Sequence, residues 1–105
     1  MSKNQLSLEE LLNLIKEKIT KKDKTSYSYS LAKEGVAKIG RKIGEEALEV
    51  IVAAFIDEKN PSKKTRNEII EETGDLFYHI LVLLAAKNIE LSEILTLLHK
   101  RNKKK

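Results

Sequence analysis

Residues 44–49 read Gly-Glu-Glu-Ala-Leu-Glu, and residues 71–75 read Glu-Glu-Thr-Gly-Asp. Each stretch lies in a long segment whose apolar residues recur at helical spacing, so each is predicted to sit on a helix. Because a helix turns by about 100° per residue, Glu45, Glu46 and Glu49 fan across one arc, and Glu72 and Asp75 lie one turn apart. If the two helices pack face to face, at least four acidic groups meet between them.

A cluster of carboxylates repels itself unless a cation lies inside it. All its ligands would be oxygen atoms, since the chain has no cysteine and no Glu-x-x-His pair. Oxygen ligands favour Mg²⁺ or Mn²⁺ over zinc or a di-iron centre. A divalent metal held by acids predicts phosphate chemistry. The alternative is a pair of solvated acidic faces, which charged helices often present.

Glycine interrupts both predicted helices close to the acids, at Gly40, Gly44 and Gly74. In mid-helix a glycine costs about 1 kcal/mol relative to alanine. Three such residues beside the acids predict a close approach of a second helix or of a ligand. The residues next to the acids are strongly apolar, so we expect the carboxylates to be half-buried.

Two lysines precede the first acidic stretch on the same arc of its helix. Lys38 and Lys42 lie one to two turns before the carboxylates. A basic turn beside a metal-binding turn suits a polyphosphate, whose oxygens bridge metal and ammonium. The same spacing also fits ordinary ion pairs, such as Lys42 with Glu46, and the residues alone leave both interpretations open.

A histidine follows the second acidic stretch by one helical turn. His79 comes four residues after Asp75 and shares its face. It could orient that carboxylate, but a core histidine with one satisfied hydrogen bond is the favoured interpretation. His99, near the basic end of the chain, indicates nothing.

The rest of the chain is also predicted to be helical, and strand signals are almost absent. Ser7 precedes an apolar repeat and is expected to cap the first helix. Asn60-Pro61-Ser62 ends the main helix, Asn88 ends the next, and Ser92 is expected to cap the last. The predicted helices span about 8–20, 27–33, 35–57, 63–87 and 92–101.

The chain has 105 residues, the size of one small domain. Between residues 76 and 86 the predicted helix is apolar nearly all the way round, which is typical of a helix buried on several sides. In a chain this short, we expect the extra covering to come from a second copy. The fold class is therefore predicted to be all-α, a helical bundle completed by homodimerisation through residues 76–86.

Positive charge is concentrated at the C-terminal end. Twenty Lys and Arg against sixteen Asp and Glu give a net charge of +4, but residues 100–105 hold five of the basic residues. The other fifteen face sixteen acids, so the body of the protein is close to neutral at −1. We interpret the tail as frayed and solubilising; the alternative is that it holds nucleic acid through phosphate contacts.

No targeting segment is predicted. Residues 1–6 lack the apolar centre of a signal peptide, and the longest apolar run, residues 76–86, is too short to span a bilayer. The lack of cysteine fits a reducing compartment without proving one. We expect a cytoplasmic protein that engages neither a membrane nor nucleic acid.

Three stretches together resemble a known family. They are residues 26–31, Ser-Tyr-Ser-Tyr-Ser-Leu, residues 35–49, Gly-Val-Ala-Lys-Ile-Gly-Arg-Lys-Ile-Gly-Glu-Glu-Ala-Leu-Glu, and residues 71–79, Glu-Glu-Thr-Gly-Asp-Leu-Phe-Tyr-His. The chain is similar to the phosphoribosyl-ATP pyrophosphohydrolases of histidine biosynthesis, within the MazG-type all-α nucleotide pyrophosphohydrolases. Their shared pattern, Glu-Glu-x-x-Glu followed by Glu-x-x-Asp, is matched by Glu45, Glu46, Glu49, Glu72 and Asp75. The resemblance covers about residues 6–100, so residues 1–105 are expected to form one such domain, with a basic tail at 100–105.

The resemblance implies an activity and a role for each matching residue. The reaction would be Mg²⁺-dependent hydrolysis of phosphoribosyl-ATP to phosphoribosyl-AMP and pyrophosphate, with Mn²⁺ as a substitute metal. Proton transfer would fall to Glu45 or Glu46, and the sequence does not decide between them. The metal ligands would be Glu46, Glu49, Glu72 and Asp75. The substrate-binding residues would be Lys38, Lys42, Ser26 and Tyr27.

The implied partners are the substrate, a second copy of the chain, and a separate phosphoribosyl-AMP cyclohydrolase, since this chain is too short to include that domain. Two other functions stay open. A house-cleaning hydrolase of non-standard nucleoside triphosphates would share the acids but not the Ser-Tyr segment. A non-catalytic helical dimer that binds nucleic acid would leave the half-buried acids unexplained.

Overall fold

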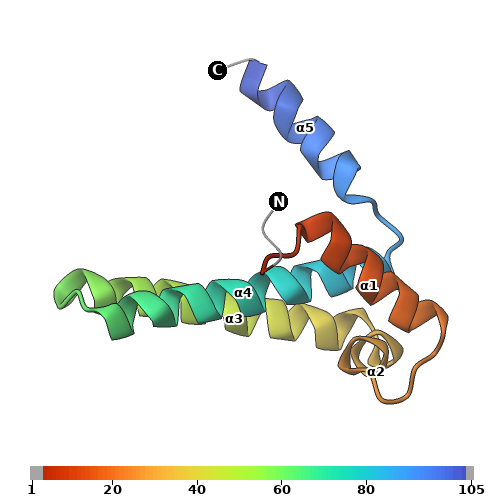
Figure 1. Cartoon of the computed structure of the whole chain (residues 1–105), viewed down its shortest axis with the longest axis horizontal. Helices are drawn as coiled ribbons and strands as arrows, with labels where there is room; N and C mark the ends of the chain where they lie inside the picture. Colours follow the sequence, from red (N-terminus) through yellow and green to blue (C-terminus); the bar gives the residue numbers. More distant parts are fainter. Residues whose placement is uncertain (1–3, 104–105) are drawn as a thin grey trace.

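The computed structural model describes residues 4–103, and within them every regular element is an α-helix (Figure 1). The prediction of an all-α fold is confirmed. Met1 to Lys3, included in the search for a signal peptide, and Lys104 and Lys105 of the basic tail lie outside the described residues. The helices are α1 (Leu8–Thr20), α2 (Tyr27–Glu34), α3 (Val36–Lys59), α4 (Lys63–Ala86) and α5 (Leu91–Lys103).

The fold is organised by a long hairpin of two antiparallel helices. Helices α3 and α4 have 24 residues each and lie side by side along their length (Figure 1). At the inner end of the hairpin, where α3 begins and α4 finishes, α1 and α2 pack against it, and α5 projects away. The outer end, around residues 57–65, extends beyond these shorter helices.

The hydrophobic core lies at the inner end of the hairpin. It is formed by apolar side chains from α1 to α4, namely Leu12, Ile15, Leu31, Ile39, Leu81, Val82 and Leu84. Between residues 44 and 78, all of which the structure describes, only Ala53 is buried. The outer hairpin therefore holds together with little apolar covering from its own chain.

Local hydrogen bonds explain most of the helix ends. Ser7 accepts a hydrogen bond from the Glu10 N–H at 3.0 Å, and Glu10 accepts one from the Ser7 N–H at 2.8 Å, a reciprocal cap for α1. Asn88 has a φ of 56°, in the left-handed region that ends helices, so its predicted role after α4 is confirmed.

One predicted cap is wrong. Helix α5 begins at Leu91, so Ser92 lies inside its first turn. The Glu90 N–H instead donates to the Glu93 carboxylate at 2.9 Å, which satisfies a backbone group at this end. At its other end, α5 continues to Lys103, so residues 100–103 of the basic segment are helical where fraying was expected.

Much of the segment predicted as an interface, residues 76–86, packs within its own chain, and the interface stays a prediction. Leu81, Val82 and Leu84 are buried by their own chain, and Leu83 packs against the same core. The large exposed apolar side chains of the hairpin lie mainly before this segment, on both long helices. They are Val36, Leu48, Ile51, Val52, Phe55, Ile56 and Ile70, together with Phe77 inside the segment.

The expectation of a close helix approach at the mid-helix glycines is also wrong within the chain. A methyl group added at Gly40, Gly44 or Gly74 would meet nothing within 4 Å. Gly35 is different, because its φ of 102° makes the turn between α2 and α3, a conformation that costs glycine little.

Among residues 4–103, no helix has the length and apolar character needed to cross a membrane.

Candidate active site

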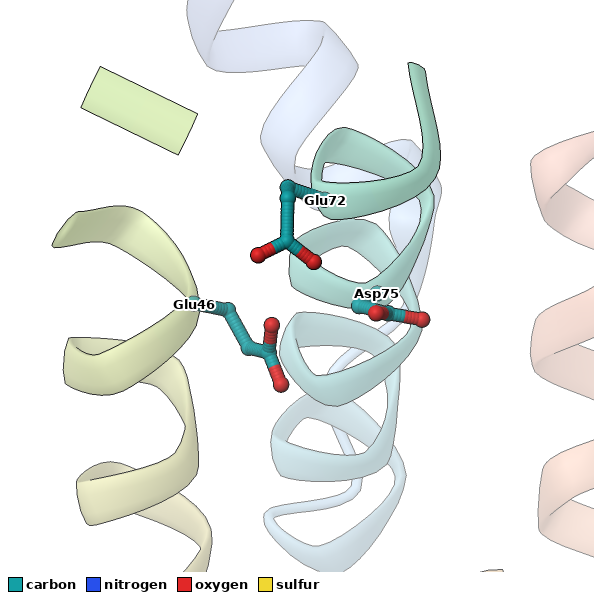
Figure 2. Close-up of side chains that lie close together, drawn as sticks. All are labelled: Glu46, Glu72 and Asp75. Atoms are coloured by element: carbon teal, nitrogen blue, oxygen red, sulfur yellow. The ribbon is translucent and has the colours of Figure 1, made fainter. Parts of the chain in front are cut away.

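Three of the predicted carboxylates converge between α3 and α4. Glu46 reaches from α3 toward Glu72 and Asp75 on α4 (Figure 2). One carboxylate oxygen from each residue lies within 4.8 Å of the other two. The antiparallel pairing of the long helices therefore brings residues 26 to 29 positions apart into one cluster, as the sequence predicted.

Glu46 is the innermost member of the cluster. Its side chain is 13% exposed, and its Oε2 atom is buried without a hydrogen-bond partner. Burial raises the pKa of the Glu46 carboxyl, and the charges of Glu49 and Asp75 raise it further, while His79 opposes the rise. A buried carboxylate oxygen without a donor is costly, and a cation at that oxygen would remove the cost.

Glu72 links Glu49 to the cluster. A hydrogen bond shared with Glu49 is the main cause that raises the pKa of Glu72 to about 7, followed by burial and by the charges of Glu49, Glu46 and Asp75. The raised pKa reflects repulsion among the carboxylates, which a cation between them would relieve. Glu49 is thus an electrostatic neighbour of the cluster, although its oxygens lie outside the set of three.

Glu45 is placed differently from the other acids. Its carboxylate is exposed and lies 3.9 Å from the Lys42 ammonium on the same helix. It does not belong to the set of three converging oxygens. Of the five predicted acids, Glu46, Glu72 and Asp75 meet, Glu49 adjoins them, and Glu45 lies outside.

A hollow of about 400 Å³ continues from the cluster along the groove between α3 and α4. Its α3 wall is largely apolar, from Leu48 to Ile56, while α4 contributes carboxylates. Two of these, Glu68 and Glu71, were not predicted as site residues. Their spacing was a signal, because Glu68 precedes Glu72 by four residues and Glu71 precedes Asp75 by four, which places each pair on one face of α4.

Behind the carboxylates, His79 is held by two hydrogen bonds. It is 7% exposed, its Nδ1 lies 2.8 Å from the Asp75 carbonyl oxygen, and its Nε2 lies 2.9 Å from the Tyr27 hydroxyl. The favoured interpretation of a core histidine with satisfied hydrogen bonds fits this geometry. The ring contacts the backbone of Asp75 and not its carboxylate, but Nδ1 also lies 4.0 Å from Glu46 Oε1.

The predicted substrate-binding residues occupy two places. The Lys42 ammonium lies beside Glu45 and close enough to Tyr27 to oppose the rise in that phenol's pKa, which burial causes. Lys38 lines a separate hollow of about 330 Å³ with Arg41, a residue that the sequence analysis passed over.

Ser26 stands at the start of α2 and accepts a hydrogen bond from the Tyr29 N–H at 3.2 Å. The sequence analysis assigned it to substrate. In the structure its oxygen caps the helix that carries Tyr27.

The fold and the site define a class: an all-α protein with a carboxylate cluster between two long antiparallel helices. Residues 8–102 match the family model described as phosphoribosyl-ATP pyrophosphohydrolase. Because this match spans most of the chain, the protein belongs to the phosphoribosyl-ATP pyrophosphohydrolase family and is an enzyme of that family.

Named proteins are similar to most of this chain. A phosphoribosyl-ATP pyrophosphatase from Metallosphaera sedula is 42% identical over 91% of this chain and 96% of its own length. One from Leptospira biflexa is 45% identical over 92% of this chain and 95% of its own length. A histidine biosynthesis bifunctional protein from Staphylococcus epidermidis is 35% identical over 97% of this chain, which corresponds to 45% of that relative.

Proposed function

We propose that the protein hydrolyses phosphoribosyl-ATP to phosphoribosyl-AMP and pyrophosphate in a Mg²⁺-dependent reaction, the second step of histidine biosynthesis. The observation that carries this proposal is the convergence of Glu46, Glu72 and Asp75 within 4.8 Å. Membership of the family supports the choice of substrate. In the cell, a phosphoribosyl-AMP cyclohydrolase would consume the nucleotide product.

The donor set fits Mg²⁺, with Mn²⁺ as a substitute. All the groups are carboxylate oxygens, which hard divalent cations prefer. The unpartnered Glu46 Oε2 and the raised pKa of Glu72 are both expected of a site that lacks its positive charge. We assign Glu46, Glu49, Glu72 and Asp75 to the metal.

When bound, the metal would neutralise charge on the leaving pyrophosphate and lower the pKa of a water molecule. The chain itself must then accept a proton. Glu45 and Glu46 are the two candidates for this role, and they differ in environment. Glu45 is exposed and outside the cluster, so its carboxylate is free of the metal set, whereas Glu46 is buried within it.

Cationic groups near the cluster would bind the phosphates of the substrate. Lys42 lies beside Glu45, one turn before Glu46, and Lys38 lies a further turn back. Ser26 caps and Tyr27 begins the helix next to Lys42, and Tyr27 is 49% exposed as a residue. Of these residues, Lys38 lines a hollow separate from the acid-lined one.

The active unit is proposed to be a homodimer. Leu48, Ile51, Val52 and Phe55 recur at helical spacing on α3 and form a second apolar stripe, with Leu48 at 62% and Phe55 at 66% exposure. Burial of apolar surface contributes about 25 cal/mol per Å², so a second copy on this stripe would stabilise the outer hairpin substantially. The hollow beside the stripe would then lie at the subunit boundary.

An assay of pyrophosphate release tests the function. With phosphoribosyl-ATP and Mg²⁺, we expect release of pyrophosphate together with phosphoribosyl-AMP, and its loss after chelation. Deoxynucleoside triphosphates serve as the comparison substrates. Faster turnover of those nucleotides than of phosphoribosyl-ATP would refute the assignment in favour of a house-cleaning hydrolase.

A further inference from the structure

Two side-chain hydrogen bonds join the short helix α2 to α4. The Tyr27 hydroxyl bonds to His79 Nε2 at 2.9 Å, and the Ser28 hydroxyl bonds to the Tyr78 hydroxyl. The residues are neighbours in both helices, so the two bonds are adjacent. Only the first ends on a ring that faces the carboxylate cluster.

The partners of His79 fix which of its nitrogens carries the proton. A backbone carbonyl only accepts hydrogen bonds, so Nδ1–H donates to the Asp75 oxygen and the neutral ring presents Nε2 as an acceptor. The Tyr27 hydroxyl then donates to Nε2. Both ring nitrogens are used, and the ring cannot turn without breaking both bonds.

The fixed ring lies against one side of the Glu46 carboxyl. Glu46 Oε1 is 4.0 Å from His79 Nδ1, while Oε2 is buried without a partner. The rings of Tyr27 and Tyr78 meet the His79 ring edge-on at 5.7 and 5.5 Å, so the imidazole is enclosed on its other sides. A ring held in this position limits where the Glu46 side chain can go.

From these contacts we infer that Tyr27 and His79 are positioning residues for Glu46: the Tyr27 hydroxyl holds the His79 ring, and the ring holds the carboxyl in place for a divalent cation. The inference deepens the proposed function and rests on it, because it assumes that Glu46 binds metal. It gives Tyr27 a role through His79, in addition to any contact of its exposed ring with substrate. Side chains that orient the ligands of a metal commonly control its affinity in this way.

Calorimetric titration of the purified full chain with Mn²⁺ alone, without substrate, tests the inference. Tyr27→Phe keeps the ring and removes the bond to His79. We expect it to weaken Mn²⁺ binding by about 3- to 10-fold, the range for one lost hydrogen bond. His79→Gln, which removes the ring itself, is expected to weaken binding by about 10-fold or more.

Tyr78→Phe is the matched control, since it also removes one tyrosine hydroxyl and one bond between α2 and α4. It should bind Mn²⁺ as the wild type does. Equal losses in Tyr27→Phe and Tyr78→Phe would overturn the inference, because general docking of α2 would then explain both. Wild-type Mn²⁺ affinity in Tyr27→Phe, with only a raised KM for phosphoribosyl-ATP, would overturn it too and assign Tyr27 to the substrate. A wild-type chain that binds no Mn²⁺ would refute the proposed metal site itself, and the inference with it.

Discussion

Glu72 makes the stability of the metal-free protein depend on pH. Its pKa is raised from its usual 4.5 to about 7, so between these values the folded state holds a proton that the unfolded chain has released. The contribution of Glu72 therefore favours the fold as the pH falls from about 7 to 5 and is lost as the pH rises through 7. Urea unfolding of the chelated protein at pH 5 to 8 should show this slope, and Glu72→Gln should flatten it. Equal slopes in the two proteins would contradict the assignment.

The acids of the cluster are expected to be essential for turnover. Glu49→Gln and Asp75→Asn keep the side-chain shape and remove a charge that the metal needs. Each substitution should abolish pyrophosphate release and leave the helical circular dichroism spectrum unchanged. Because each also removes a negative charge from the cluster, the free energy of unfolding without metal should not fall. Wild-type activity in either variant would remove that residue from the metal set.

Lys42 is expected to serve the substrate and not only its neighbour Glu45. Lys42→Ala should lower kcat/KM for phosphoribosyl-ATP by roughly 10-fold or more, if a charged hydrogen bond of about 1.5–3 kcal/mol is lost. Its exposed ion pair with Glu45, 3.9 Å long, is worth little to the fold, so the melting temperature should barely change. Unchanged kinetics in both Lys42→Ala and Lys38→Ala would contradict a role in substrate binding and favour the interpretation that these lysines form only surface ion pairs.

At the residue scale, the sequence was more successful in predicting which acids come together than in predicting how each one is oriented. The helical wheel placed Glu45, Glu46 and Glu49 on one arc, and that arc is wide. Glu46 is seven residues from buried Ile39 and from buried Ala53, so it shares their inward direction. Glu45 is turned by about 100° from that direction and reaches solvent. Burial therefore determines which acid on the arc points inward, and burial depends on which other helices pack against α3.

At the scale of the elements, helix positions were largely predictable, because capping residues and breakers have local causes. Ser7, Asn60-Pro61-Ser62 and Asn88 act where the sequence placed them. The prediction that Ser92 caps the last helix was wrong. The Glu90 N–H donates to the Glu93 carboxylate, and the helix begins one residue earlier, at Leu91. The contacts of Tyr27 with His79 were not predictable, since they join residues 52 positions apart through tertiary packing.

A glycine in α3 offers a test at this scale. Gly40 is exposed, and a methyl group there would meet nothing within 4 Å of its own chain. Gly40→Ala should therefore raise the free energy of unfolding by about 0.5–1 kcal/mol through helix propensity. Chemical denaturation measures this difference. A loss of stability would show that a second copy of the chain occupies the space.

At the scale of the whole molecule, the exposed apolar stripe on α3 predicts where the subunits meet. Phe55→Lys places a charge on that stripe, where the side chain is 66% exposed, and should give a folded chain of half the mass at micromolar concentration. Leu83→Lys places a charge against the core and should unfold the protein instead. Native mass spectrometry and circular dichroism distinguish the two results. A Phe55→Lys protein with the mass of the wild-type assembly would exclude this stripe as the interface.

For the surface where two copies would meet, the sequence and the structure favour different segments, and the interface itself stays a prediction. The run at residues 76–86 is apolar nearly all round because α1, α2 and α3 of the same chain all pack near it. The sequence shows how apolar a helix is, but not how many faces its own chain covers. The less continuous apolar residues 48–55 are the ones left exposed.

The account depends most on a divalent cation between α3 and α4. A crystal structure of the Mn²⁺-loaded protein, recorded at the manganese absorption edge, tests this most directly. We predict an anomalous peak coordinated by Glu46, Glu72 and Asp75, with Glu49 completing the set, at the boundary between two subunits. A peak bound by other residues only, or no peak in protein that hydrolyses phosphoribosyl-ATP in the same solution, would contradict it.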